Sequence, residues 1–165
     1  MRQKNGSVVT EYSPESRPQA CAAHDWDPKV DKIIQTEHPP HRILVVEDDS
    51  ILRRLNTTML IGAGYDVDTA EDGAVAWDII QLKTFDLLIT DNSMPNVTGI
   101  ELIRKVRAAG IAVPIIMATA ALPKDVFAQF PCLRPTAAVI KPYTLEDLLG
   151  TVKNVLCEIA SVAIC

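Results

Sequence analysis

The sequence predicts an α/β protein in which helices cover both faces of a doubly wound, five-stranded parallel sheet. Two observations support this fold class. From residue 42 onward, short apolar and β-branched runs alternate five times with helical patterns. The runs are apolar throughout, which is typical of parallel strands that are buried on both sides. Right-handed crossovers between such strands place the intervening helices on both faces of the sheet.

The expected strands are five short runs rich in aliphatic residues: 42–47, 65–70, 86–90, 113–119 and 137–141. The first helix is indicated by Ile51, Leu55 and Met59, which recur at a spacing of four. Glycines at 62 and 64 end it. Similar patterns predict helices at 73–82 and 99–110 and a short, proline-bounded helix at 122–130.

The last helix has the clearest pattern, because a single apolar stripe runs along it. The stripe consists of Leu145, Leu148, Leu149, Val152, Val155, Leu156 and Ile159. Thr144 and Asp147 stand where an N-cap residue and its reciprocal acid belong. These signals predict a helix that begins just after Thr144.

The composition changes near residue 41. Residues 1–41 contain many prolines and charges but no sustained apolar period. Such a segment buries too little apolar surface to offset chain entropy, so we expect a flexible, mostly irregular or disordered N-terminal arm. Residues 42–165 are expected to fold as one domain, long enough to bury about two-thirds of its unfolded surface.

Charge and hydropathy argue against several classes of function. The formal net charge is −5 and no basic stripe is present, so we expect no direct nucleic-acid binding. The longest nearly apolar run, 111–122, is too short to span a bilayer and contains a proline, so we expect no membrane segment. The four cysteines show no disulfide spacing and no signal peptide precedes them, which favours a cytoplasmic protein.

Polar side chains follow four of the five expected strands. Glu47 and Asp48 end the first, Asp91 the third, Thr119 the fourth and Lys141 the fifth. In an open parallel sheet the ligand crevice lies at the carboxyl ends of the strands, so these side chains are expected to converge there.

This set of side chains suits phosphoryl transfer. Clustered carboxylates repel one another unless a cation lies among them, and all-oxygen ligands suit Mg²⁺. A carboxylate screened by a metal and a lysine can act as a nucleophile and form an aspartyl phosphate. We therefore expect Asp91 to be a phosphate acceptor that a buried strand presents and a following turn holds.

Four motifs follow one another along the domain: ILVVEDD (43–49), DLLITDNSMPNVTGIEL (86–102), PIIMATA (114–120) and VIKPY (139–143). Together they resemble the receiver domains of response regulators in two-component phosphorelay systems, over residues 42 to about 158. The resemblance implies a flavodoxin-like receiver fold. It also implies that Asp91 accepts a phosphoryl group from a histidine kinase or a histidine phosphotransfer protein.

The resemblance assigns further roles residue by residue. It implies that Glu47, Asp48, Asp91 and the backbone carbonyl of Ser93 bind Mg²⁺. Thr119 matches the hydroxyl that turns toward the phosphoryl group, and Lys141 matches the lysine that pairs with that group. The pattern departs from the family at Ala138, where receivers usually carry an aromatic side chain that moves with the threonine.

Only 23 residues follow Pro142, so no output domain is expected after the receiver. The favoured reading is a stand-alone receiver, not a conventional enzyme, that binds an unknown downstream protein or relays phosphate. An interaction module that needs no phosphorylation is the first alternative, because of Ala138. A phosphatase of the haloacid dehalogenase type is less favoured, because Ser93 stands where a second acid is required. A detached piece of a hybrid kinase is the remaining alternative.

Overall fold

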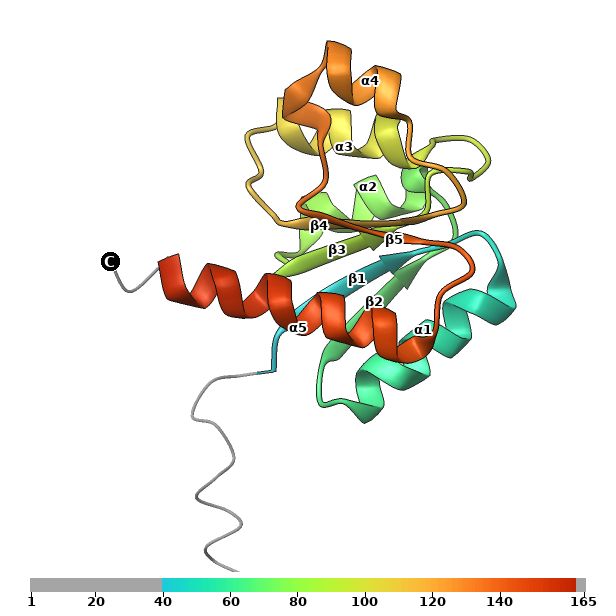
Figure 1. Cartoon of the computed structure of the whole chain (residues 1–165), viewed down its shortest axis with the longest axis vertical. Helices are drawn as coiled ribbons and strands as arrows, with labels where there is room; N and C mark the ends of the chain where they lie inside the picture. The colour runs from blue at the N-terminus through green and yellow to red at the C-terminus, as the bar shows by residue number, and fades with distance from the viewer. Residues whose placement is uncertain (1–39, 163–165) are drawn as a thin grey trace, which may run out of the picture. The chain divides into compact units, whose positions relative to one another are not determined.

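The computed structural model describes residues 40–162, with side chains through Glu158. Five parallel strands form one sheet in the order β2-β1-β3-β4-β5 (Figure 1). Their bounds are Arg42–Val46 (β1), Asp66–Ala70 (β2), Leu87–Thr90 (β3), Ile115–Thr119 (β4) and Ala137–Ile140 (β5). This strand order confirms the doubly wound sheet that the sequence predicts, and the order reverses between β1 and β3. The predicted arm, apart from residues 40 and 41, lies outside the described residues.

Five α-helices and one 3₁₀ turn connect and follow the described strands. They are α1 (Ser50–Gly62), α2 (Gly73–Leu82), α3 (Gly99–Ala108), α4 (Lys124–Gln129), η1 (Pro131–Leu133) and α5 (Leu145–Val162). Helices α1 and α5 cover one face of the sheet, and α2, α3 and α4 lie on the other (Figure 1). No helix within residues 40–162 is long and apolar enough to cross a membrane.

The core forms two apolar layers, because successive side chains of a strand point to opposite faces. Ile43 and Val45 of β1 pack in the layer under α1 and α5, whereas Leu44 and Val46 pack in the layer under α2 and α3. Strands β1, β3 and β4 are buried almost throughout. The edge strands β2 and β5 have only one neighbour each and expose several residues, so uniform burial was the wrong expectation there.

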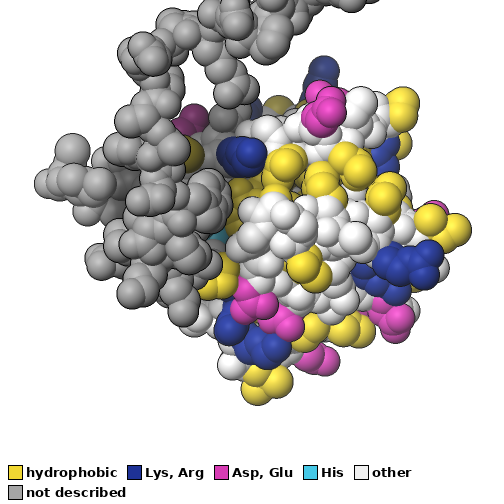
Figure 2. Space-filling view, turned by 90° about the horizontal axis from the view of Figure 1, so that it is seen from below, with side chains coloured by type: hydrophobic (Ala, Val, Ile, Leu, Met, Phe, Trp, Pro, Cys, Tyr) yellow, Lys and Arg dark blue, Asp and Glu magenta, His cyan; other side chains and the backbone are white. Residues whose placement is uncertain are grey.

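Helix α1 is present as predicted, but its apolar stripe faces the core only toward the end of the helix, where Met59 is partly buried against the layer under α1 and α5. Ile51 is 73% exposed and Leu55 is 47% exposed. Asn56 and Leu60 are the buried residues of this helix. The buried side of the helix is therefore centred on Asn56 and Leu60, one residue further along than the predicted stripe. Figure 2 looks onto the α1 and α5 side of the domain and shows apolar side chains at its surface between charged ones.

Side-chain caps set the ends of several helices. Asp49 accepts hydrogen bonds from the backbone N–H groups of Ile51 and Leu52, which starts α1 directly after the acidic end of β1. The hydroxyl of Thr144 accepts from the backbone N–H of Asp147, whose carboxylate bonds back to Thr144, so the predicted cap of α5 is confirmed.

Asp72 caps α2 and also holds the loop that follows β3. Its carboxylate accepts the backbone N–H groups of Ala74 at 2.8 Å and Val75 at 2.9 Å. The side-chain amide of Asn96 donates to the other carboxylate oxygen. Asn96 has a φ of 60°, a left-handed conformation that asparagine tolerates. The bonds from Val75 and Asn96 lower the pKa of Asp72 below its ordinary value of 3.8.

We expect Asp72→Ala to lower the free energy of unfolding at pH 7 by about 1–2 kcal/mol, the usual effect of losing such a cap. Since folding lowers the pKa of Asp72, the ionised carboxylate stabilises the fold above the unfolded-state value. This contribution is lost as the pH falls through the folded-state pKa. Urea unfolding at pH 7 and near pH 3 measures how much unfolding free energy Asp72→Ala loses relative to the wild type, and this loss should be smaller near pH 3. The exposed Asp78→Ala on the same helix is the control, and an equal loss at both pH values would contradict the prediction.

Candidate functional site

The carboxyl edge of the sheet gathers the side chains that the sequence predicts. Glu47 follows β1, Asp91 follows β3, Thr119 ends β4 and Lys141 follows β5. Strand pairing brings these ends to one level, since Val46 is in register with Thr90, and Thr119 with Ile140. Glu47, Asp91 and Thr119 are buried at this edge.

Lys141 joins the two buried carboxylates. Its Nζ donates to Asp91 Oδ2 at 2.6 Å, and to Glu47 Oε1 and Oε2 at 3.0 and 2.8 Å. The Lys141 side chain is 22% exposed, against 4% for Glu47 and 8% for Asp91. The ammonium therefore balances part of the negative charge that β1 and β3 bring together.

The backbone around Asp91 fixes the direction of its carboxylate. Its own N–H donates to the carbonyl of Val46 at 3.0 Å, which continues the pairing of β3 with β1. Its Oδ1 accepts the N–H groups of Asn92 and Ser93, the latter at 3.1 Å. One carboxylate oxygen is thus held by the turn and the other by Lys141.

Gly99, the first residue of α3, lies against the backbone of Asp91 and Asn92 in the loop that follows β3. A Cβ at this position would lie 2.2 Å from the backbone oxygen of Asp91 and 3.0 Å from the Cα of Asn92. Such distances are far below ordinary carbon contacts, so only glycine lets α3 begin this close to Asp91.

Burial and neighbouring charges shift the pKa values of Glu47 and Lys141. Burial raises the pKa of Glu47 above its usual 4.5, although the bond from Lys141 opposes this, and the charges of Asp91 and Asp48 add to the rise. Burial acts to lower the pKa of Lys141, but the hydrogen bonds to Asp91 and Glu47 outweigh it, so the pKa lies above the usual 10.5. Lys141 therefore stays protonated at neutral pH.

Three carboxylates at this edge form a set that fits a divalent cation. Glu47, Asp48 and Asp91 can each offer one oxygen, and these oxygens lie within 4.8 Å of one another. Asp48 is exposed at the start of the loop, whereas the other two are buried. Oxygen ligands with open access to water are what Mg²⁺ prefers. Ser93, whose carbonyl is the further predicted ligand, lies exposed two residues after Asp91.

The sequence matches the family model of the response regulator receiver domain over residues 43–153. The chain belongs to this family. The match covers all five strands, apart from the first residue of β1, and reaches into α5. Solved receiver structures confirm the predicted fold.

Three relatives illustrate the likeness. The chemotaxis protein CheY of Pseudomonas aeruginosa is 32% identical over 117 residues, which are 69% of this chain and 94% of CheY. Protein RcaC of Microchaete diplosiphon is 34% identical over 70% of this chain but only 18% of its own length. The structure of the response regulator TrrA of Thermotoga maritima, in complex with Mg²⁺-BeF, has a TM-score of 0.62 and 30% identity, covering 70% of this chain and 98% of TrrA. This receiver thus spans most of some relatives and a small part of others.

Thr119 lies at the predicted edge of the receiver, but its hydroxyl does not join the charged cluster. The Thr119 hydroxyl donates to the carbonyl of Ala121 at 3.4 Å, and no hydrogen bond among the described residues joins this hydroxyl to the side chains of Asp91 or Lys141. Ala138, on the edge strand β5, is exposed.

Sequence reasoning missed the role of Arg53. The guanidinium donates to the backbone carbonyls of Glu47 and Asp48, the latter at 3.2 Å, and so ties α1 to the acidic loop. Its position in the first turn of α1, directly after the acidic loop, is the only sequence signal for this contact. The neighbouring Arg54 is exposed.

Proposed function

We propose that this receiver accepts a phosphoryl group on Asp91, in a Mg²⁺-dependent reaction, from a histidine kinase or a histidine phosphotransfer protein. The observation that carries the proposal is the carboxylate of Asp91, which is fixed by the amides of Asn92 and Ser93 and paired with Lys141. A carboxylate held in this way is oriented for in-line attack on a phosphorus atom.

In the proposed transfer, an Asp91 carboxylate oxygen forms a bond to phosphorus while the bond from phosphorus to the donor imidazole nitrogen breaks. The donor nitrogen keeps the electron pair of the broken bond, and Asp91 needs no base because it reacts as the carboxylate. A cation bound by Glu47, Asp48 and Asp91, with the carbonyl of Ser93, would neutralise the phosphoryl oxygens. Lys141 and Thr119 would supply an ammonium and a hydroxyl to those oxygens.

The consequence of phosphorylation is proposed to be a change in partner binding, or the onward relay of the phosphoryl group. The near-complete coverage of CheY supports a receiver that acts without an attached output domain. The complex of TrrA with Mg²⁺-BeF supports the same chemistry, since beryllofluoride on an aspartate imitates an acyl phosphate.

The test is intact-mass measurement after incubation with Mg²⁺ and acetyl phosphate, a donor that needs no partner protein. We expect an adduct of one phosphoryl group in the wild type and none in Asp91→Asn or after chelation of the metal. Calorimetric titration with beryllofluoride in the presence of Mg²⁺ covers the case of an acyl phosphate that hydrolyses quickly. Asp125→Asn, which alters an exposed acid on α4, is the control and should leave the adduct in place.

A second function has one specific observation in its favour. Ala138 carries no ring, so the aromatic movement that accompanies phosphorylation in most receivers has no counterpart at this position. A receiver that binds its partner irrespective of phosphorylation would bind that partner equally well with and without beryllofluoride. It would also keep its function in the Asp91→Asn variant. These two results together would favour the phosphorylation-independent interaction over the first proposal.

A further inference from the structure

Asn56 is a polar side chain in a place that favours an aliphatic one. It is 1% exposed and lies on the buried side of α1, one turn before the fully buried Leu60. Its Nδ2 donates to the hydroxyl of Tyr143 at 3.0 Å. Its Oδ1 is buried and has no hydrogen-bond partner among the described residues.

An amide with one unpaired buried atom lowers stability, because its lost hydration is not replaced. Departures from the apolar pattern of a core tend to occur where function requires them. The single bond that Asn56 makes is therefore the feature that needs a functional explanation.

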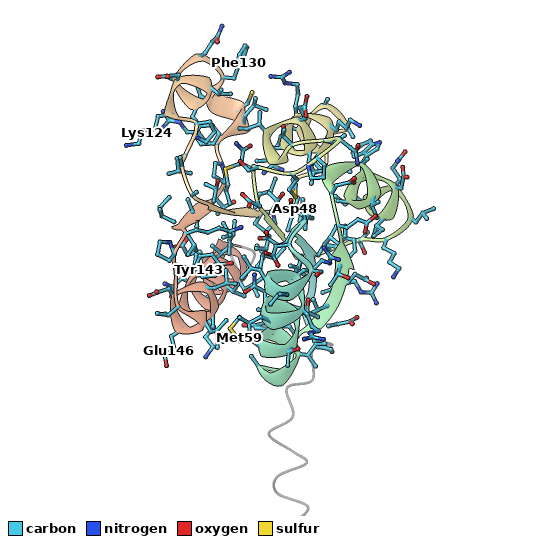
Figure 3. The ribbon with its side chains drawn as sticks, turned by 90° about the vertical axis from the view of Figure 1, so that its right-hand side faces the viewer. Asp48, Met59, Lys124, Phe130, Tyr143 and Glu146 are labelled. Atoms are coloured by element: carbon cyan, nitrogen blue, oxygen red, sulfur yellow. The ribbon has the colours of Figure 1, made fainter. Side chains whose placement is uncertain are left out.

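That bond connects α1 to the segment that carries Lys141. Tyr143 lies two residues after Lys141 and just before the N-cap of α5, and its ring packs against the apolar layer beneath α1 and α5. Figure 3 shows Tyr143 at the start of α5, beside α1 and on the side of the domain where Asp48 lies. The segment is held on its other side by the N–H of Lys141, which donates to the carbonyl of Thr119 at 2.9 Å.

The surroundings of Tyr143 shift the pKa of its phenol. Burial raises the pKa of Tyr143 above its usual 10, while Asn56 and Lys141 lower it and Glu47 and Asp91 raise it. The hydroxyl that bonds to Asn56 belongs to the residue two positions after the lysine that bridges Glu47 and Asp91.

We propose that Asn56 and Tyr143 are positioning residues for the phosphoryl-transfer reaction, and that the hydrogen bond between them holds Lys141 where it reaches Asp91 and Glu47. This inference rests on the proposed function of Asp91. The position of the ammonium is set from two sides, by the β4 backbone at Thr119 and by α1 through Tyr143. Loss of the bond from α1 leaves the lysine segment anchored on one side only.

The experiment compares Tyr143→Phe, Asn56→Leu and the double variant with the wild type. For each, calorimetry gives the affinity for beryllofluoride in saturating Mg²⁺, urea unfolding gives the stability, and acetyl phosphate gives the rate of phosphorylation. We expect each single variant to bind beryllofluoride about tenfold more weakly, as for other residues that orient the groups of a metal site. Tyr65→Phe, at another half-buried tyrosine against the same apolar layer, is the matched control and should bind as the wild type does.

The double variant separates positioning from stability. Removing both polar partners leaves no unpaired buried group, so the double variant should regain most of the stability that Tyr143→Phe loses. Its beryllofluoride affinity should remain about tenfold reduced, because the bond is still missing, and the effects of the two single changes should not add.

Recovery of affinity together with stability would overturn the positioning role, as would wild-type affinity in either single variant. A wild type that takes up neither phosphoryl nor beryllofluoride is a different result. In that case the function proposed for Asp91 fails first, and the role of Asn56 and Tyr143 fails with it.

Discussion

Replacing Lys141 with methionine is expected to slow phosphorylation of Asp91 by about 100-fold or more, the usual effect of removing one charged donor from a developing anion. The same change should lower the free energy of unfolding without Mg²⁺ by about 3 kcal/mol. The reason is that Nζ is bonded to both Glu47 and Asp91, which are almost fully buried and would repel each other without it. Methionine keeps the length and apolar stem of lysine, so packing changes little.

Quenched-flow measurement with acetyl phosphate gives the rate, and urea unfolding with and without Mg²⁺ gives the stability. Added Mg²⁺ should stabilise Lys141→Met more than the wild type, since the ion then supplies the only cation among the three carboxylates. Lys83→Met is the matched control: Lys83 contacts Asp68 at the same 2.8 Å, but that pair is exposed. An exposed pair contributes less than about 1 kcal/mol, so equal losses in the two variants would contradict the interpretation.

Gly99→Ala is expected to damage the site and the fold together. The added methyl group would meet the backbone oxygen of Asp91 at 2.2 Å, and neither that oxygen nor the first turn of α3 can rotate away as a flexible side chain could. We expect a loss of about 3 kcal/mol in the free energy of unfolding, at the upper end for overpacking. We also expect weaker beryllofluoride binding, because α3 and the Asp91 loop must separate.

Gly150→Ala provides the opposite case within the same chain. Gly150 lies inside α5, and a Cβ there would have no atom within 4 Å. Replacing a glycine inside an exposed helix surface should raise stability by about 0.5–1 kcal/mol. Thermal unfolding of both variants, with beryllofluoride titration of the folded proteins, tests the pair. The prediction for Gly99 is wrong if its alanine variant is as stable as the wild type and binds beryllofluoride equally well.

Features that depend on local sequence were predictable. The apolar runs located β1, β3 and β4, and the cap at Thr144 located the start of α5. The edge of the sheet at which polar residues gather followed from the parallel topology alone. That rule brought Asp91 and Lys141 together although they are 50 residues apart.

Features that depend on distant contacts were not predictable. The spacing of Ile51 and Leu55 indicated a helix, but only packing against the sheet decided that Asn56 and Leu60 are its buried side. A buried asparagine on a helix has no sequence signal until its partner, Tyr143, is known. The requirement for glycine at 99 likewise arises from the backbone of Asp91, which only the folded chain brings near.

The lysine bridge has a consequence for how the site responds to its surroundings. A counter-ion that is part of the polypeptide has the same occupancy at every salt concentration, whereas a diffusing cation binds according to its supply. Because Lys141 is mostly buried with its two partners, dissolved salt screens these contacts far less than it screens exposed pairs. The carboxylates of Glu47 and Asp91 can therefore remain side by side whether Mg²⁺ is scarce or abundant. Changes in the surrounding ions would then alter the rate of the proposed phosphoryl transfer without changing the arrangement of the two carboxylates.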